Sequence, residues 1–140
     1  MSSDPFSLHP QLAADCLVIG DWPLCRVLRM NDRTFPWLIL VPRRAGMRDI
    51  IDLGEADQMG LMREIGLASQ GLRRQLSPDK LNVAALGNAV PQLHVHVIAR
   101  FVGDPAWPKP VWGVTPAVQF DPPASVEEAA HWRQALGPFQ

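Results

Sequence analysis

The hydrophobic pattern of the chain predicts short strands on either side of one long helix. Apolar runs at 16–19, 25–30 and 37–42 have the length of strands, and polar turn segments, GDWP and NDRTFP, separate them. The run WLILVP has no polar position, which is typical of a central strand covered on both faces, and Pro42 closes it. A short helical turn, HPQLAAD, precedes these three expected strands.

The segment after these strands has the period of an amphipathic helix. Apolar residues recur along one face at steps of three and four: Leu61, Ile65, Ala68, Leu72 and Leu76. Asp52 stands three residues before Glu55, the spacing of a capping box, and the Ser77-Pro78 pair predicts the end of the helix. Four charged residues fall largely off the stripe and are expected in solvent: Arg63, Glu64, Arg73 and Arg74.

Two further strands are expected after the helix, in KLNVAAL and QLHVHVIA. In the second, Leu93, Val95 and Val97 alternate with Gln92, His94 and His96. Because side chains alternate across a strand, both histidines should project from one face, roughly 6.6 Å apart along the strand, while the aliphatic face packs on the core. This pair of imidazoles is the strongest candidate for chemistry in the chain.

The remainder, 102–140, has a different texture. Proline-rich sequence with Trp107 and Trp112 predicts an extended arm that the tryptophans anchor on the domain. A short terminal helix should follow, capped by Ser125 with Glu128 at the third position. We therefore expect one α+β domain over 1–140, with a mainly antiparallel five-stranded sheet and one main helix, and with its core at about 16–101.

The composition of the chain limits the kinds of partner that it is expected to bind. The 140-residue chain is 47% hydrophobic and 19% charged with a net charge of -1, so nucleic acid and anionic membrane are not expected partners. No apolar run approaches the roughly 18 residues of a membrane span. The start, MSSDPFSLHP, lacks the pattern of a secretory signal. Cys16 and Cys25 are interpreted as buried, reduced residues of a cytoplasmic protein.

Three roles are open to His94 and His96. They could be hydrogen-bonded surface or interface residues, metal ligands, or catalytic groups. A zinc site needs a third and usually a fourth ligand, and the other histidines, the cysteines and the carboxylates stand at no recognisable ligand spacing, so no metal site is predicted. A neutral imidazole whose Nδ1 proton is held in a hydrogen bond presents Nε2 as a nucleophile, and the second ring can bind phosphate oxygens or handle a proton.

The segment QLHVHVIAR resembles the active-site strand of the histidine triad family of nucleotide hydrolases and transferases. Gln92 stands at the first position of the triad, His94 at the middle and His96 at the third. The resemblance extends over about 16–101. The central strand of the family resembles WLILVPRR. The lead into the triad resembles GNAVPQLHVHV, with Asn88 in place of Gln. The family commonly places a ribose-binding Asn or Asp where this chain has RMND, and Asn31 matches it.

The resemblance implies a homodimer whose sheets join into one continuous sheet, and a nucleotide as substrate. His94 would attack the α-phosphate of an AMP-X type substrate, a dinucleoside polyphosphate or a nucleoside phosphoramidate, and give a nucleotidyl-histidine intermediate that water hydrolyses. His96 would contact phosphate oxygens. Two residues of the turn into the triad belong to the expected site: Gly87, where the backbone approaches closely, and Asn88, at a phosphate or leaving group. Two more have alternatives: Asn31 could bind the ribose or be only a turn residue before Asp32, and Asn82 could line the site or pair with a neighbour. No tightly bound cofactor is implied, although a divalent cation could arrive with a polyphosphate.

Two departures from the family pattern leave an alternative open. Gln92 keeps hydrogen-bonding capacity, and its backbone carbonyl, but cannot titrate. Trp37 stands near the place where many members carry another histidine before the central strand. A nucleotide-binding module with little or no turnover is therefore the competing interpretation. Arg100, beyond the histidines, is expected either near phosphate or as a solvated strand end.

Overall fold

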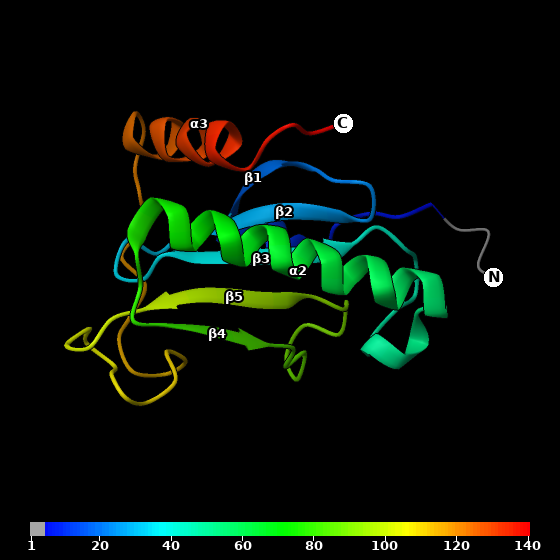
Figure 1. Ribbon diagram of the computed structural model, residues 1–140, viewed down its shortest axis with the longest axis horizontal. Helices are drawn as coiled ribbons and strands as arrows, with labels where there is room; N and C mark the ends of the chain where they lie inside the picture. Colours follow the sequence, from blue (N-terminus) through cyan, green and yellow to red (C-terminus); the bar gives the residue numbers. More distant parts are fainter. Residues whose placement is uncertain (1–4) are drawn as a thin grey trace.

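The computed structural model describes residues 5–140 and contains a five-stranded sheet in which every pair of neighbours is antiparallel. The order across the sheet is β1-β2-β3-β5-β4 (Figure 1). The strands are β1 (Cys16–Asp21), β2 (Cys25–Met30), β3 (Trp37–Pro42), β4 (Lys80–Ala84) and β5 (Val95–Arg100). The central place of β3 and the α+β class are confirmed.

Three α-helices and one turn of 3₁₀-helix accompany the sheet in the described residues: α1 (Pro10–Asp15), η1 (Ile50–Asp52), α2 (Glu55–Leu76) and α3 (Ala124–Leu136). Figure 1 shows α2 lying across one face of the sheet with α3 beside it. Across residues 5–140, no helix combines the length and the apolar character that a membrane span requires.

The sheet is covered on both faces, but by different material. On one face, aliphatic side chains of the strands pack against the stripe of α2 and against α3, including Val27, Leu40 and Val97. The other face packs against α1, the preceding N-terminal segment and the arm, which contributes Ala106 and Val111. The second cover has no long helix, and the histidines lie under it.

Both predicted helix caps were wrong. The Asp52 carboxylate accepts hydrogen bonds from the backbone N–H groups of Arg48 and Asp49, at 3.1 and 2.9 Å, and so caps the start of η1. Helix α2 begins after Gly54 without a side-chain cap. Ser125 lies inside α3, which starts at Ala124. An acceptor side chain near a helix start can bind several nearby N–H groups, so spacing alone does not determine which turn it caps.

Glu64 was wrongly expected in solvent. It is 2% exposed, and its carboxylate accepts the backbone N–H groups of Leu24 and Cys25 at 2.9 and 2.8 Å. These N–H groups lie where the chain turns from β1 into β2. The buried charge is compensated by two hydrogen bonds from a segment about forty residues away.

Arg100 is neither a solvated end nor a residue of the site. It is 1% exposed and donates to Asp104 at 2.8 Å and to the side-chain oxygen of Asn82 at 2.8 Å. Asp104 also accepts the backbone N–H groups of Ala106 and Trp107. The Arg100 guanidinium holds the pKa of the Asp104 carboxyl at about 2. This ion pair folds the start of the arm back onto the sheet.

Candidate active site

The two histidines sit where the chain enters β5. His94 immediately precedes the strand, which begins at Val95 rather than at the expected Gln92, because the N–H of Leu93 is bonded to the carbonyl of Met47 outside the sheet. The two imidazoles lie edge to face with their centroids 4.9 Å apart and are 7% and 6% exposed. The expectation that both rings share one face therefore agrees with the structure.

His94 is oriented by the backbone. Its Nδ1 lies 2.7 Å from the carbonyl oxygen of Gln92. A carbonyl can only accept, so Nδ1 carries the proton and Nε2 of the neutral ring keeps its lone pair. This is the arrangement that a nucleophilic imidazole requires, and it depends on the main chain of Gln92 rather than on its side chain.

His96 is held by a different neighbour. The indole Nε1 of Trp37 donates to Nδ1 of His96 at 3.0 Å, and both residues are buried. Trp112 packs edge-on against the His96 ring, with 5.0 Å between centroids. Burial, and secondarily the nearby His94, lower the pKa of His96 to about 4. The ring is therefore neutral at neutral pH.

The side chain of Gln92 faces the N-terminal segment. Its Oε1 accepts the backbone N–H of His9 at 2.8 Å, and its Nε2 donates to the carbonyl of Ser7 at 2.8 Å. His9 in turn caps α1 through its Nδ1. The amide at the first triad position thus tethers residues 7–9 beside the site.

His94 and His96 line a largely apolar cavity of about 300 Å³, within the size range of small-molecule sites. One wall is the turn that leads into the triad, in which Gly87 has φ +69°, a conformation that favours glycine, and Asn88 is exposed. The other lining residues are Leu12, Asp15, Cys16, Met30, Trp37, Ile39, Leu86, Ala89, Val90 and Trp112. A single carboxylate, Asp15, lies among them.

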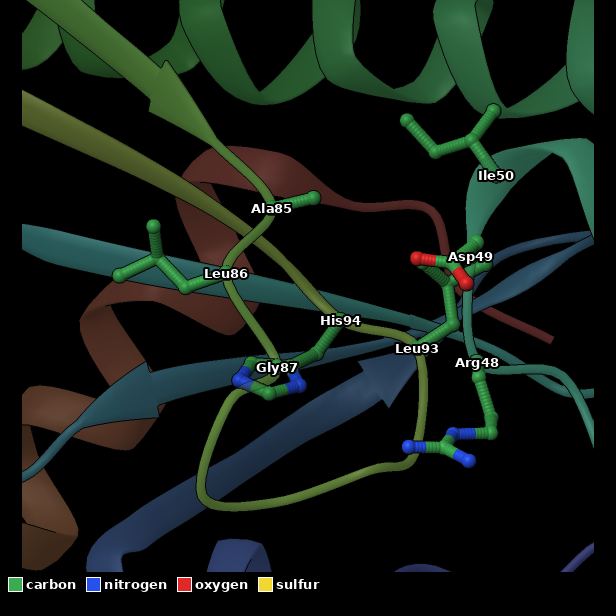
Figure 2. Close-up of a pocket in the computed structure, with 8 residues that line it drawn as sticks. All are labelled: Arg48, Asp49, Ile50, Ala85, Leu86, Gly87, Leu93 and His94. Carbon is green, nitrogen blue, oxygen red and sulfur yellow. The ribbon is translucent and has the colours of Figure 1, made fainter.

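A second, more polar pocket of about 170 Å³ lies on the other side of His94. Figure 2 shows the His94 ring beside Gly87, with Arg48 and Asp49 across the pocket on the segment that leads into η1. His94 and Gly87 line both spaces. A group bonded to His94 would therefore have an apolar cavity on one side and a guanidinium on the other.

The predicted site residues fall into two groups. Gly87 and Asn88 lie with the histidines around the cavity. Asn31 and Asn82 are not among its lining residues: the Asn31 Oδ1 accepts the N–H of Phe120 at 2.7 Å, and Asn82 is bonded to Arg100. Sequence reasoning missed Asp15 and the role of Trp112, because their positions depend on how distant segments cover the sheet.

The other candidate groups show little reactivity. Within residues 5–140, no group of three or more His, Cys, Asp or Glu side chains is arranged to hold a metal ion. Cys16 and Cys25 are both buried and unpaired. Burial is the main cause that raises the pKa of Cys16 to about 12 and that of Cys25 further. Neither thiol is therefore ionised to a useful extent near neutral pH.

Comparison with known proteins identifies the class to which this fold and this pair of histidines belong. The HIT domain model matches residues 11–103. The chain belongs to the histidine triad family.

Three solved structures are similar over nearly their whole length. A histidine triad protein from Bradyrhizobium japonicum is 50% identical, with 95% of this chain and 96% of that chain covered and a TM-score of 0.87. One from Marinobacter aquaeolei is 47% identical, with 95% and 97% covered and a TM-score of 0.91. One from Sinorhizobium meliloti is 44% identical, with 94% of each chain covered and a TM-score of 0.86. No curated protein gave a significant match.

Proposed function

We propose that the protein is a hydrolase or nucleotidyl transferase that acts on the α-phosphate of an AMP-X type substrate through a covalent intermediate on His94. The observation that supports this most directly is the 2.7 Å bond between Nδ1 of His94 and the carbonyl of Gln92, which leaves Nε2 as a nucleophile in a cavity wall. Family membership supports the same chemistry, since histidine triad proteins are in general nucleotide-binding hydrolases and transferases.

The reaction has two steps. The lone pair on Nε2 of His94 attacks phosphorus, an N–P bond forms, and the bond from phosphorus to the leaving group breaks. Water or another acceptor then attacks the same phosphorus, the N–P bond breaks, and the electron pair returns to Nε2. The incoming oxygen loses its proton to solvent. The backbone at Gly87 allows close approach of the phosphate to the turn.

The two spaces around His94 suggest how the substrate lies. The apolar cavity, with Leu12, Met30 and Trp112, suits the nucleoside, and the Asp15 carboxylate can accept hydrogen bonds from ribose hydroxyls. Asn31 stays a proposed ribose ligand only through the family resemblance, since its Oδ1 accepts the N–H of Phe120. The second, more polar pocket suits the leaving group, because the Arg48 guanidinium lines it. No tightly bound cofactor is proposed, and a divalent cation is expected only with a polyphosphate substrate.

A nucleotide-binding module with little turnover is the second candidate, and one observation favours it. The first triad position carries an amide, which cannot titrate, and both ends of that amide are bonded to Ser7 and His9. The cytoplasmic location inferred from the two unpaired cysteines also stays a prediction.

A turnover screen separates the two candidates. The protein is assayed against adenosine phosphoramidates and dinucleoside polyphosphates, and intact-mass measurement after an acid-free quench looks for a nucleotide-sized adduct. The proposal expects multiple turnovers and an adduct that is absent from His94→Ala. Tight nucleotide binding with neither turnover nor adduct would establish the binding module instead.

A further inference from the structure

His96 has a proton position that the structure determines without reference to catalysis. An indole N–H can donate a hydrogen bond but cannot accept one. The Trp37 indole lies 3.0 Å from Nδ1 of His96, so this nitrogen must present its lone pair. In the neutral imidazole the single proton is then on Nε2. His94, whose Nδ1 carries the proton, has the opposite tautomer.

We propose that Trp37 is a positioning residue that locks His96 as the Nε2–H tautomer, so that His96 serves the reaction as a fixed hydrogen-bond donor beside the His94 nucleophile. The lock itself follows from the contact between two buried side chains. Its catalytic consequence rests on the proposed function.

The surroundings of His96 oppose any change of its proton state. If Nδ1 took up a proton, two N–H donors, that of His96 and that of the Trp37 indole, would face each other with no acceptor between them. Two rings pack on the His96 ring, those of Trp112 and the edge-to-face His94, and the cavity that it lines also holds the Cys16 thiol and one carboxylate, Asp15. The lowered pKa of His96 agrees with this geometry.

A neutral, locked donor limits what His96 can do for the leaving group. It can stabilise negative charge on a phosphoryl oxygen through Nε2–H, but giving up that proton would leave an imidazolate, which is too basic to form at neutral pH. His96 therefore cannot protonate the leaving group, which departs with its electron pair as an anion and takes its proton from water. The structure thus favours substrates whose leaving group is a stable anion, such as a phosphate or polyphosphate, over phosphoramidates of basic amines.

The lock is tested by NMR of protein with ¹⁵N-labelled histidine rings. Wild-type protein should show His96 as the Nε2–H tautomer from pH 6 to 8, with no titration in that range. Trp37→Phe should allow the other tautomer and raise the pKa of His96 toward its ordinary value. Trp112→Phe, which changes a ring that packs on His96 without replacing its donor, should keep the Nε2–H form. An Nδ1–H form in the wild type, or an unchanged tautomer in folded Trp37→Phe, would overturn the lock.

Kinetics test the positioning role. Trp37→Phe should lower kcat roughly tenfold to a hundredfold, less than the roughly hundredfold to thousandfold loss expected when a donor to transition-state charge is removed outright, with KM changed less than threefold. Trp37→His, which restores a ring N–H, should recover part of kcat together with the Nε2–H signal. A Trp37→Phe protein that has lost the tautomer but keeps full kcat would refute the role. If the wild type turned over no substrate, the proposed function would fail while the NMR result still decided the lock.

The choice of leaving group gives an independent measure. For AMP esters and amides of increasing leaving-group basicity, kcat/KM should fall steeply, and polyphosphate leaving groups should exceed simple alkylamines by at least about a hundredfold. Equal rates for amine and polyphosphate leaving groups would show that the site supplies a proton, and would contradict a locked His96.

Discussion

His94 and His96 are the same residue type two positions apart, yet their neighbours give them different properties. A carbonyl that can only accept places a proton on Nδ1 of His94, and an indole that can only donate removes it from Nδ1 of His96. One ring therefore offers a lone pair at Nε2 and the other an N–H at Nε2. The alternation of the sequence indicated that the rings share a face, but not this division, because Trp37 is distant in the chain.

Replacing the nucleophile should separate chemistry from binding. His94→Ala is expected to abolish turnover while nucleotide affinity stays within roughly tenfold, about 1.4 kcal/mol, because the nucleoside is proposed to bind in the apolar cavity. Activity assays and calorimetric titration with a nucleotide measure the two effects. The exposed His131 of α3 provides a matched control, and His131→Ala should retain full activity. Undiminished turnover by His94→Ala would exclude the covalent mechanism.

The lowered pKa of His96 predicts how stability depends on pH. Between pH 6.5 and 4 an unfolded chain takes up a proton at this position, but the folded protein, in which the pKa is about 4, does not. The free energy of unfolding should therefore decrease as pH falls through this window, with His96 contributing up to about 1.4 kcal/mol per pH unit.

Urea unfolding at a series of pH values measures this slope. His96→Asn should flatten it whatever its effect on overall stability, whereas His131→Asn on the protein surface should leave it unchanged. A slope that is the same in His96→Asn and wild type would show that His96 titrates normally in the folded protein.

At the scale of elements, the hydrophobic pattern correctly predicted the helices and strands that depend on residues close together in the sequence. The stripe of α2 and the apolar run of β3 depend on residues within a few positions of one another, and both are confirmed. Three predictions at this scale were wrong: the helix cap at Asp52, the exposure of Glu64 and the surroundings of Arg100. Each depends on which other groups the folded chain brings within hydrogen-bonding distance. The same reason explains why Asp15 and Trp112 were not expected in the cavity.

Glu64 joins α2 to the turn between β1 and β2, so its removal should destabilise the fold. Glu64→Gln keeps one acceptor but presents an amide N–H₂ to a backbone donor, and a cost of about 1–3 kcal/mol is expected. Chemical denaturation measures this loss. The neighbouring exposed Arg63 gives the control, since Arg63→Gln should change stability by less than about 0.5 kcal/mol. Equal stability of the two variants would mean that the buried carboxylate is not required.

At the scale of the whole molecule, the two edges of the sheet are unequal. The β1 edge is occupied: the N–H of Gln140 bonds to the carbonyl of Asp21, and Arg133 of α3 donates to the carbonyl of Ile19. The β4 edge has no such cover from α3, and it carries the half-exposed Val83. Because an open edge favours pairing with another strand, β4 is the edge at which two copies would join their sheets.

A homodimer formed through β4 is therefore predicted. Light scattering at micromolar concentration should give about twice the 15.5 kDa chain mass. Val83 and Val18 are both 48% exposed, on β4 and β1 respectively, and form a matched pair. Val83→Lys should shift the protein toward monomer, and Val18→Lys should leave the dimer intact. A wild-type monomer throughout this range would contradict the prediction, and loss of the dimer only in Val18→Lys would place the interface at β1.

The tether at Gln92 has a consequence for how the site responds to its environment. A primary amide accepts from His9 and donates to Ser7 at once, and it does so in the same form from acid to alkaline conditions. A histidine in its place would lose its only acceptor whenever it became charged. The segment 7–9, which this amide holds beside the proposed site, is thus attached by a group whose hydrogen bonds do not change with pH.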